Sequence, residues 1–454
     1  MSELGLLPDG WALTDLGGII SISSGKGLTK SKMVEGDIPV FGGNGITGWH
    51  NDTNINKVTI AIGRVGFYCG SVHLTPAKAW ITDNAFVTSF DDGSINQKFL
   101  YQLLTNTDLR QNDSSTAQPV ISGAKVYPIG IHLPPLAEQK VIADKLDELL
   151  AQVESTKARL DAIPAILKSF RQSLLAAAVS GKLTEEWRGS NKYEIQGNKL
   201  LPVGWKSEPA SMVCLKVQSG STPRDNPFDQ NGTIPFLKVY NIVNQKIDFD
   251  YKPQFVTADV HKSSLKRSIA QPNDVLMNIV GPPLGKVAVL TDQYPEWNLN
   301  QAITLFRADP SALHHLFLYH VLCEGELVRE VMPDTKGSVG QVNISLSQCR
   351  DALLPIPPLN EQIEIVRRVE ELFAFADKVE TQVNAAQLRV NNLTQSILAK
   401  AFRGELTADW RTANPSLISG DNSAEALLER IKAEREVLAT KKKPTKKASI
   451  RKKA

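Results

Sequence analysis

The chain has 454 residues, of which 42% are hydrophobic and 22% charged, and its formal net charge is +3. This composition is ordinary for a globular protein, and the length suggests two to four domains. No apolar run approaches the roughly 18 residues of a membrane-spanning helix and no signal-peptide pattern is present, so we expect a cytoplasmic protein. Four widely separated cysteines without a Cys-x-x-Cys pair argue against disulfides and a zinc site.

Positive charge is concentrated at the C-terminus. Residues 441–454 carry seven Lys and one Arg and no acidic residue. Subtracting these eight charges from +3 leaves −5 on the rest of the chain. We expect the tail to be disordered, and either simply solvated or attracted non-specifically to phosphates. Composition therefore does not identify the body of the chain as a nucleic-acid binder.

A long internal repeat organises the chain. Residues 133–188 recur at residues 356–411, shifted by 223 positions without a gap, and about twenty of the 56 aligned pairs are identical. A shorter echo precedes each copy, Leu-Pro-Asp-Gly-Trp at residues 7–11 and Leu-Pro-Val-Gly-Trp at residues 201–205. The chain is thus a variable stretch followed by a constant stretch, twice over. Such a repeat predicts two similar halves related by a pseudo-twofold axis.

The first variable segment, up to residue 132, indicates a β-rich domain. Short runs rich in Ile, Val, Phe and Thr, such as residues 57–63, alternate with Gly, Asn, Asp and Pro. Its loops contain Arg and Asn, which pair with base edges, and Lys, which contacts phosphates. Each loop taken alone is more typical of an ordinary turn than of a base contact. The candidate DNA contacts of this segment are Lys26, Lys30, Lys32, Asn44 and Arg64.

The first constant segment predicts a long helix. Pro-Pro-Leu-Ala-Glu-Gln at residues 134–139 places prolines and a carboxylate where the first helical turn tolerates and favours them. Gly181 follows the last apolar residue and predicts the helix end. Pro164 interrupts the pattern, whereas its counterpart in the second copy is Gln387. We therefore expect a kink or a restart near residues 161–164.

The second variable segment, residues 205–355, has the same β-rich texture, for example at residues 274–280. Its loops again combine cationic, aromatic and amide side chains that could contact DNA. The candidates are Arg224, Lys238, Tyr240, Asn241, Lys262, Lys266, Arg267, Lys336 and Gln341.

Both constant segments carry the spacing of a coiled coil. Apolar residues recur three and four positions apart from Ile142 to Leu174 and again from Val369 to Ile397. Two seams of matching length favour packing against each other; the alternative is that each helix is buried in its own domain. The predicted seam contains Leu146, Leu149, Val153, Leu160, Leu167, Leu372, Val379, Val383, Val390 and Leu393.

The predicted helices are long enough to act as a spacer. From Ile142 to Leu174 is roughly 48 Å at about 1.5 Å per residue. That length corresponds to roughly 14 base pairs of B-DNA. A stiff pair of helices with a domain at each end could hold two reading domains about one turn of DNA or more apart.

Catalytic motifs fail on spacing. Residues 281–287 resemble a phosphate loop but have three residues between the glycines instead of four, and Val287 stands where Ser or Thr should hold magnesium. Residues 225–228 faintly resemble an adenine methyltransferase motif, without the glycine-rich strand that binds its cofactor. We predict no catalytic residue and no metal ligand in this chain.

With this arrangement, the chain resembles the specificity subunits of type I restriction–modification enzymes, and the enterobacterial branch most of all. The likeness covers about residues 7–440 and is most specific in the constant segments, including residues 396–407. It implies an α+β fold, in which two β-rich target recognition domains are separated by a pair of long antiparallel coiled-coil helices. The expected parts are a first recognition domain at 1–132, a helical region at 133–200, a second recognition domain at 201–355, a second helical region at 356–411, and a C-terminal helix with the basic tail at 412–454.

The resemblance also implies function and partners. Each recognition domain would read one half of a split site in double-stranded DNA, and the coiled coil would set the spacer. Two modification subunits would bind S-adenosylmethionine and methylate adenine N6, while restriction subunits would use ATP and Mg²⁺, so this chain itself would need no cofactor. We expect the partner-subunit interface at Glu138, Gln139, Trp187, Arg188, Glu361, Gln362, Trp410 and Arg411.

Two other interpretations stay open on the sequence alone. One is a self-contained DNA-modifying enzyme, which would need a methyl-donor site that the motifs do not supply. The other is a coiled-coil scaffold whose two β-rich domains bind protein or sugar rather than DNA.

Overall fold

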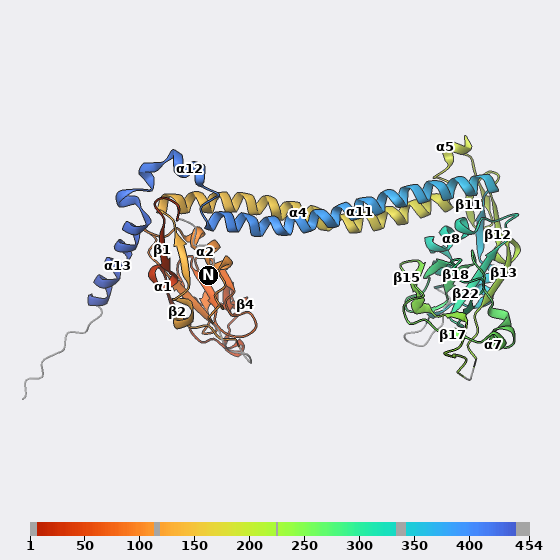
Figure 1. Cartoon of the computed structure of the whole chain (residues 1–454), viewed down its shortest axis with the longest axis horizontal. Coiled ribbons are helices and arrows are strands. Elements are labelled where there is room, and N and C mark those ends of the chain that lie inside the picture. The colour runs from red at the N-terminus through yellow and green to blue at the C-terminus, as the bar shows by residue number, and fades with distance from the viewer. Residues whose placement is uncertain (1–6, 113–118, 224–225, 333–341, 442–454) are drawn as a thin grey trace, which may run out of the picture. The chain divides into compact units, whose positions relative to one another are not determined.

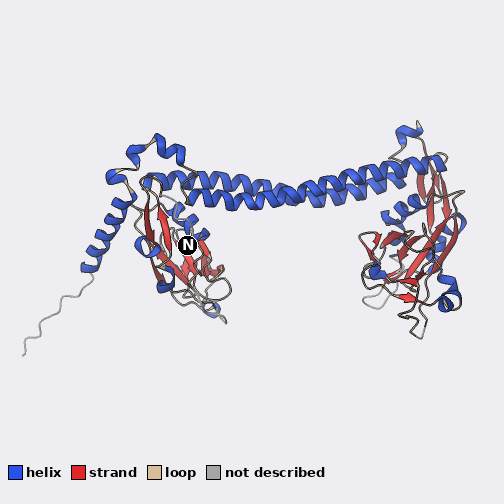
Figure 2. Cartoon of the chain, viewed as in Figure 1, coloured by secondary structure: helices blue, strands red, loops and turns tan. Residues whose placement is uncertain are grey.

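The computed structural model describes residues 7–112, 119–223, 226–332 and 342–441 (Figure 1). Its chain divides into two compact units, one made of residues 1–160 and 386–454 and the other of residues 161–385. Each unit combines a β-rich head with part of each of two long helices (Figure 2). These helices are α4 (Leu136–Val179) and α11 (Leu359–Phe402).

The first head contains two small sheets and a strand pair. Strand β1 (Ala12–Asp15) pairs with β9 (Gly130–Leu133), next to α4. The four-stranded sheet has the order β2 (Ser21–Ser24), β8 (Ala85–Ser89), β5 (Ile60–Gly63) and β6 (Val72–Leu74). The three-stranded sheet has the order β4 (Gly45–His50), β3 (Ile38–Gly42) and β7 (Trp80–Ile81). The short helices are α1 (Leu16–Ile19), η1 (Lys30–Lys32), α2 (Gln97–Asn106) and α3 (Gly123–Val126).

The second head contains corresponding sheets. Strand β12 (Lys206–Pro209) pairs with β24 (Leu353–Ile356). The four-stranded sheet has the order β13 (Cys214–Ser219), β22 (Ile303–Ala308), β18 (Val275–Asn278) and β20 (Val287–Val289). The three-stranded sheet has the order β17 (Phe255–Val256), β14 (Ile234–Leu237) and β21 (Asn298–Leu299). Three small pairs are β10 (Tyr193–Gln196) with β11 (Lys199–Pro202), β15 (Ile242–Val243) with β16 (Lys246–Ile247), and β19 (Val280–Gly281) with β23 (Val342–Asn343). Its helices are α6 (Ala210–Val213), η2 (Val239–Asn241), α7 (Ala258–Lys262), η3 (Lys266–Ser268), α8 (His315–Glu324), α9 (Glu326–Val331) and α10 (Leu346–Asp351).

The two heads share one topology. The order β2-β8-β5-β6 corresponds to β13-β22-β18-β20, and β4-β3-β7 corresponds to β17-β14-β21. The strand directions also agree, since β3 and β7 are parallel in one head and β14 and β21 in the other. The duplication seen in the constant segments therefore extends through the variable segments, where the sequence alone did not reveal it.

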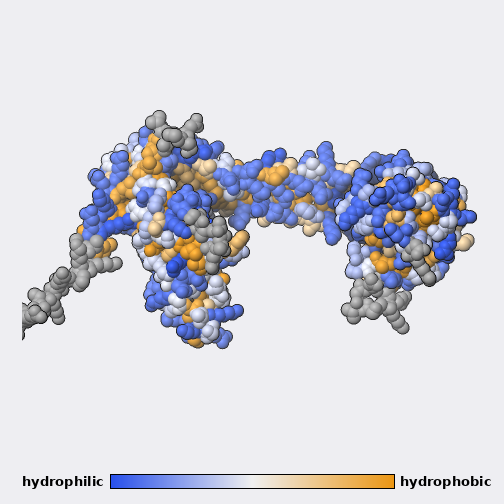
Figure 3. Space-filling view, turned by 60° about the horizontal axis from the view of Figure 1, so that its bottom comes forward, coloured by the Kyte–Doolittle hydropathy of each residue, from blue (hydrophilic) through white to orange (hydrophobic). Residues whose placement is uncertain are grey.

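Helices α4 and α11 pack together as an antiparallel pair. In the first unit Ile142 of α4 shares a core with Ile397 of α11, and Lys145 Nζ lies 3.1 Å from the carbonyl oxygen of Leu406, just after the end of α11. In the second unit Arg171 Nη2 of α4 lies 2.7 Å from Asp377 Oδ1 of α11. The prediction of a paired coiled coil is confirmed. On the face shown in Figure 3, the surface of the pair is mostly hydrophilic, with scattered apolar side chains.

Most of the predicted seam lies between the helices. Leu146, Leu167 and Val383 are buried, and six further seam residues are half-buried: Leu149, Val153, Leu160, Leu372, Val379 and Val390. The prediction that Leu393 belongs to the seam is wrong, because this residue is 48% exposed. Thr394 is half-buried instead and precedes the buried Ile397. A helix has about 3.6 residues per turn, so a strict three-and-four alternation drifts and the seam moves by one position here.

Pro164 does not interrupt the first long helix. Helix α4 runs unbroken over 44 residues, from Leu136 to Val179, with the proline inside it. Of the kink or restart predicted near residues 161–164, the restart is therefore wrong. Pro164 lies on an exposed face, where water can bond the carbonyl group that loses its helical partner. The boundary between the two compact units falls at residues 160 and 161, directly before this site.

Each head shares its core with the ends of both long helices. The core of the first unit includes Ile142 of α4 and Ala401 of α11, both fully buried. That of the second includes Ala178 of α4 and Val369 of α11. The first unit also contains α13 (Ala424–Lys441), whose Ala424 N–H donates to the carbonyl of Gly10. Across the described residues, no helix is both long and apolar enough to cross a membrane.

Candidate nucleic-acid interface and its junctions

Four loops of the first head meet at one end of its sheets. The Lys26 N–H donates to the carbonyl of Ile81 over 3.0 Å, and the Arg64 N–H donates to the carbonyl of Asn84 over 2.9 Å. Ser71 Oγ donates to the carbonyl of Gly43 over 2.8 Å. We call this region the first loop end; it comprises residues 25–37, 43–44, 64–71 and 82–84. The predicted contacts Lys26, Lys30, Lys32, Asn44 and Arg64 all lie in it.

The first loop end contains a cleft of about 730 Å³. Lys30 and Lys32 line it, and both side chains are exposed, as are those of Lys26 and Asn44. Ammonium groups at an open cleft attract phosphates, whereas an exposed amide can read a base edge. Asp83 lines the cleft as well. This end therefore suits an anionic polymer better than an apolar ligand.

Arg64 is held in place at the base of its loop. Its Nη1 lies 3.3 Å from Ser24 Oγ and 3.5 Å from the Asp83 carbonyl oxygen, and its guanidinium carbon lies 5.6 Å from the centre of the Phe86 ring. Both hydrogen bonds use Nη1, so the other guanidinium nitrogens have no partner among the described residues. A partly exposed, oriented guanidinium of this kind can bond a guanine edge or a phosphate.

The second head builds an equivalent loop end. The Ser221 N–H donates to the carbonyl of Leu299 over 2.9 Å, and the Ile279 N–H donates to the carbonyl of Ala302 over 2.9 Å, as Lys26 and Arg64 do in the first head. The position of Arg64 is thus taken by the buried Ile279. Three predicted contacts, Arg224, Lys336 and Gln341, lie outside the described residues.

The remaining predicted contacts of the second head differ in exposure. Lys262, Lys266 and Arg267 are exposed on α7 and η3. The Nζ of Lys238 lies 4.5 Å from the centre of the Phe228 ring, which holds the cation in place. The Tyr240 hydroxyl donates to the carbonyl of Lys252 over 3.2 Å, and burial raises its pKa, so it stays protonated at neutral pH.

The prediction that Asn241 contacts DNA is wrong. It is completely buried, and its Oδ1 accepts from the N–H of Lys238 over 3.0 Å. Its Nδ2 donates to the carbonyls of Asp248 and Tyr251, over 3.1 and 2.9 Å. These bonds close a loop on itself. Asparagine is favoured in turns as well as at adenine, and the sequence did not distinguish these roles.

Two glycines support the loop ends and were not singled out from the sequence. A Cβ on Gly25 would lie 2.3 Å from the carbonyl oxygen of Ile81, and one on Gly220 would lie 2.0 Å from that of Asn300. Only glycine allows the backbone to approach so closely. The signal available was the Ser-Gly pair that ends the strand in both heads, at residues 24–25 and 219–220.

A buried glutamate joins the first head to both long helices. Glu138, at the start of α4, accepts from Trp11 Nε1 over 2.8 Å, from Thr407 Oγ1 over 2.6 Å and from Arg411 Nη1. We call these four residues the Glu138 junction. Trp11 opens the head, while Thr407 and Arg411 follow the end of α11. The junction therefore fixes three separate segments of the first unit around one carboxylate.

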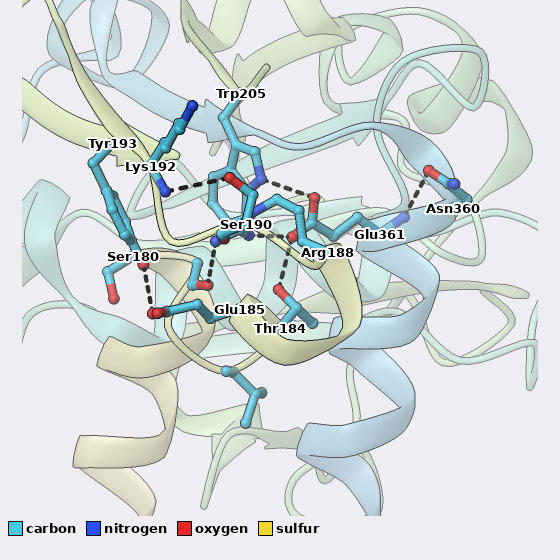
Figure 4. Close-up of polar contacts among 12 residues, drawn as sticks. Ser180, Thr184, Glu185, Arg188, Ser190, Lys192, Tyr193, Trp205, Asn360 and Glu361 are labelled. Atoms are coloured by element: carbon cyan, nitrogen blue, oxygen red, sulfur yellow. Dashed lines mark hydrogen bonds and ion pairs between the residues drawn. The ribbon is translucent and has the colours of Figure 1, made fainter. Parts of the chain in front are cut away.

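The second unit repeats this arrangement as the Glu361 junction (Figure 4). Glu361 accepts from Trp205 Nε1 over 3.0 Å, from Thr184 Oγ1 over 2.7 Å and from Arg188 Nη1 over 2.6 Å. Figure 4 shows the four side chains converging where α4 ends and α11 begins. In each junction the glutamate comes from one copy of the repeat and the threonine and arginine from the other.

The neighbouring glutamines tie a head helix to each junction. Gln139 Oε1 accepts from the N–H of Asn96, the N-cap of α2, over 2.8 Å. Gln362 Oε1 accepts from the N–H of His314, the N-cap of α8, over 2.7 Å. Both glutamines also donate to a carbonyl of the proline pair that precedes their own helix, at Pro134 and Pro357.

The junctions correct the predicted partner-subunit interface. Glu138, Gln139, Glu361 and Gln362 are buried and bonded within the chain, so they have no surface to offer a partner. The side chains of Arg188 and Arg411 are only 11% and 13% exposed, because they pair with the glutamates. Trp187 on α5 (Glu185–Arg188) is 42% exposed, and Trp410 on α12 (Ala408–Ala413) is half-buried. These two tryptophans keep accessible surface.

Comparison with known proteins decides what this architecture is. The family model of the type I restriction modification DNA specificity domain matches residues 8–165 and 202–386, one head and helix at a time. The chain belongs to this family of specificity subunits. It is 41% identical over 367 residues to the type I restriction enzyme EcoBI specificity subunit of Escherichia coli, covering 78% of this chain and 74% of the relative. It is 35% identical over 477 residues to the EcoDI specificity subunit of the same species, covering 98% and 99%.

A solved structure agrees with the fold. The crystal structure of the HsdS subunit from Thermoanaerobacter tengcongensis covers 89% of this chain and all of that chain, with a TM-score of 0.60 at 19% identity. The specificity-subunit fold, two recognition heads on a helical pair, is confirmed, as is the enterobacterial resemblance. The self-contained enzyme and the scaffold with heads that do not bind DNA gain no support from these comparisons.

Proposed function

We propose that each head of this specificity subunit reads one half of a bipartite site in double-stranded DNA, and that the helical pair sets the spacer. The observation that carries the proposal is the equivalence of the two loop ends. The same backbone frame carries different side chains in the two heads, as at the partly exposed Arg64 and the buried Ile279. Two readers built alike but lined differently suit two half-sites of different sequence.

The chemistry would belong to partner subunits. Two modification subunits would bind S-adenosylmethionine and transfer its methyl group to adenine N6, and restriction subunits would use ATP and Mg²⁺. This chain would direct both activities without catalysing either. Among the described residues no group of His, Cys, Asp and Glu could hold a metal ion.

The repeated tryptophans support two copies of one partner. Trp187 and Trp410 occupy equivalent positions, directly before the junction arginines Arg188 and Arg411. Tryptophan is one of the residue types that are enriched at the energetic centres of protein interfaces. We propose that each modification subunit contacts one of them. Trp187→Ala should weaken binding of one copy, and the double variant with Trp410→Ala should weaken binding of both.

Mapping methylated adenines in the host genome tests the reading function. Methylation at one bipartite sequence should depend on this chain and on its modification partner. Replacing residues 205–355 by the second head of another family member should change one half of that sequence and keep the other half. A purified chain that methylates DNA alone, or a replacement that changes both halves, would overturn the proposal.

A further inference from the structure

One loop has the same frame in both heads although its tip differs. It joins β5 to β6 at residues 64–71 and β18 to β20 at residues 279–286. Both copies read Val-Gly, three further residues and Gly. The closing glycines are in the left-handed region, with φ of +87° at Gly70 and +72° at Gly285. Each donates its N–H to the last residue of the preceding strand, over 2.7 and 3.3 Å.

The surroundings of the two loops also agree. The carbonyl of Arg64 accepts from the N–H of Ile121 over 3.0 Å, and that of Ile279 accepts from the N–H of Ile344 over 2.9 Å. In both heads the loop is therefore held by the strand before it and by the segment that leads to the head's last strand. A frame fixed at both sides keeps its tip in a defined position.

The tips are apolar and face outward. Phe67 is 81% exposed and Tyr68 is 53% exposed, and their rings meet edge to face with centres 5.1 Å apart. The equivalent positions in the second head are Pro282 and Pro283, both exposed. Leaving a phenylalanine so exposed forgoes the burial of a large apolar surface, which marks the tip as a contact site.

The charges around the first tip indicate which partner it meets. Arg64 begins the loop, and the aliphatic part of Arg110 lies against Gly70, 3.3 Å from where a Cβ would be. Through Ser71 and Gly43 the loop also adjoins the cleft lined by Lys30 and Lys32. An apolar tip with cations on one side is complementary to DNA, whose phosphates flank a stack of flat bases.

We propose that these tips are wedges that press between or against base steps of the bound duplex, Phe67 and Tyr68 in one half-site and Pro282 and Pro283 in the other. The inference rests on the proposed function and deepens it. Phenylalanine and proline are both side chains that proteins insert at base steps to unstack and kink DNA. The two heads would then deform their half-sites with different tips on one frame, and deformability would add to the sequence read by direct contacts.

The test uses the full chain assembled with its modification partner. The DNA is a duplex that contains the bipartite sequence identified by methylation mapping. Phe67→Ala with Tyr68→Ala should weaken duplex binding by roughly tenfold or more and should reduce the DNA bend measured by energy transfer between end labels. The conservative pair Phe67→Trp and Tyr68→Phe should keep both.

Mismatched DNA separates a wedge from a simple contact. A series of duplexes, each with one mismatch in the first half-site, offers steps that are already weakly stacked. On the mismatched duplex that the Phe67→Ala, Tyr68→Ala variant binds most tightly, its affinity should be at most about threefold below that of the wild type. The reason is that the tip no longer has to drive the unstacking. Pro282→Ala with Pro283→Ala should show the same rescue for mismatches in the second half-site only.

The matched control is Leu13→Ala, because Leu13 is 59% exposed in the same head but lies on β1. It should bind every duplex as the wild type does. An equal loss on matched and mismatched DNA would overturn the wedge, as would unchanged DNA binding or a loss confined to assembly with the modification partner. Absence of sequence-specific binding by the wild-type complex would instead refute the proposed function itself.

Discussion

The Nη1 atom of Arg188 lies 2.6 Å from Oε1 of Glu361, and the two side chains are only 11% and 3% exposed. Arg411 and Glu138 form the corresponding pair in the other unit. Each arginine also donates through Nη2 to the carbonyl of the glycine that follows the preceding long helix. Arg188 donates to Gly181 after α4, and Arg411 donates to Gly404 after α11. Removing one partner of a buried ion pair strongly destabilises the folded protein, because the other charge stays buried and unpaired.

Glu361→Ala should therefore destabilise the second unit by about 3–5 kcal/mol. The substitution leaves Arg188, Trp205 and Thr184 without their common acceptor. Denaturant unfolding followed by tryptophan fluorescence would measure the loss. Lys57→Ala is the control, since its pair with Asp92 is 69% and 65% exposed and should contribute less than about 1 kcal/mol. A loss below about 1 kcal/mol for Glu361→Ala would contradict the junction.

Acid should destabilise the second unit through His320. This side chain is 3% exposed, and neither ring nitrogen has a hydrogen-bond partner in the part of the chain that the structure describes. Burial lowers its pKa from the usual 6.5 to about 4. A pKa lower in the folded than in the unfolded state means that stability is lost as the pH falls below 6.5. Between pH 8 and pH 5 the loss should be about 2 kcal/mol.

His320→Leu should flatten this pH dependence, whatever it does to stability at pH 8. Burial also lowers the pKa values of His314 and His315, so a smaller slope of the same sign should remain. Unfolding free energies of wild type and variant between pH 5 and pH 8 provide the comparison. Identical slopes for the two proteins would show that His320 is not the group that titrates.

Lengthening both helices should lengthen the spacer. Lys145 meets Leu406 and Arg171 meets Asp377, so the level that faces Lys157 of α4 is near Asn392 of α11. Seven residues added at both places preserve the seam and extend each helix by about 10 Å, or about three base pairs. Methylation mapping should show the same two half-sites further apart. The same insertion in α4 alone should abolish methylation, and an unchanged spacer with both insertions would count against the helical pair as the ruler.

Gly25→Ala should impair reading of the first half-site only. Its Cβ would lie 2.3 Å from the Ile81 carbonyl oxygen, so the loop that carries Lys26, Lys30 and Lys32 must shift. We expect roughly tenfold weaker binding, measured on duplexes that vary one half-site at a time. Gly130→Ala is the matched control in the same head, because nothing lies within 4 Å of the added methyl group. Equal effects of the two substitutions would exclude a steric role for Gly25.

The helical pair was predictable because its signal is local. Residues three and four apart on one helix must share a face, so the spacing from Val369 to Ile397 predicts a seam without knowledge of the partner. Its one error, at Leu393, arose where the register moved to Thr394. The predicted restart at Pro164 is wrong, because the proline lies on the exposed face of α4, where water can bond the carbonyl group that loses its helical partner.

The strand pairing and the junctions were not predictable in the same way. Strand β2 pairs with β8 across more than sixty positions, and no short pattern connects Ser24 with Phe86. Glu138 and Glu361 look in sequence like exposed glutamates of a first helical turn, and the resemblance implied that partner subunits bind along these constant segments. The clue was that Trp, Glu, Thr and Arg recur together in both copies, as a set that functions together must.

The junctions meet their heads almost entirely through groups that do not depend on the head's own sequence. Gln139 and Gln362 accept from main-chain N–H groups, at Asn96 and His314, and each glutamate contacts its head through one tryptophan of the repeated opening pentapeptide. The junction contacts are thus the same for any head, while the sequence of the head is free to vary. A recombination event that exchanged everything between that tryptophan and the next proline pair would keep the junction contacts. A lineage could then acquire a new recognised DNA sequence in one step, with the rest of the molecule unchanged.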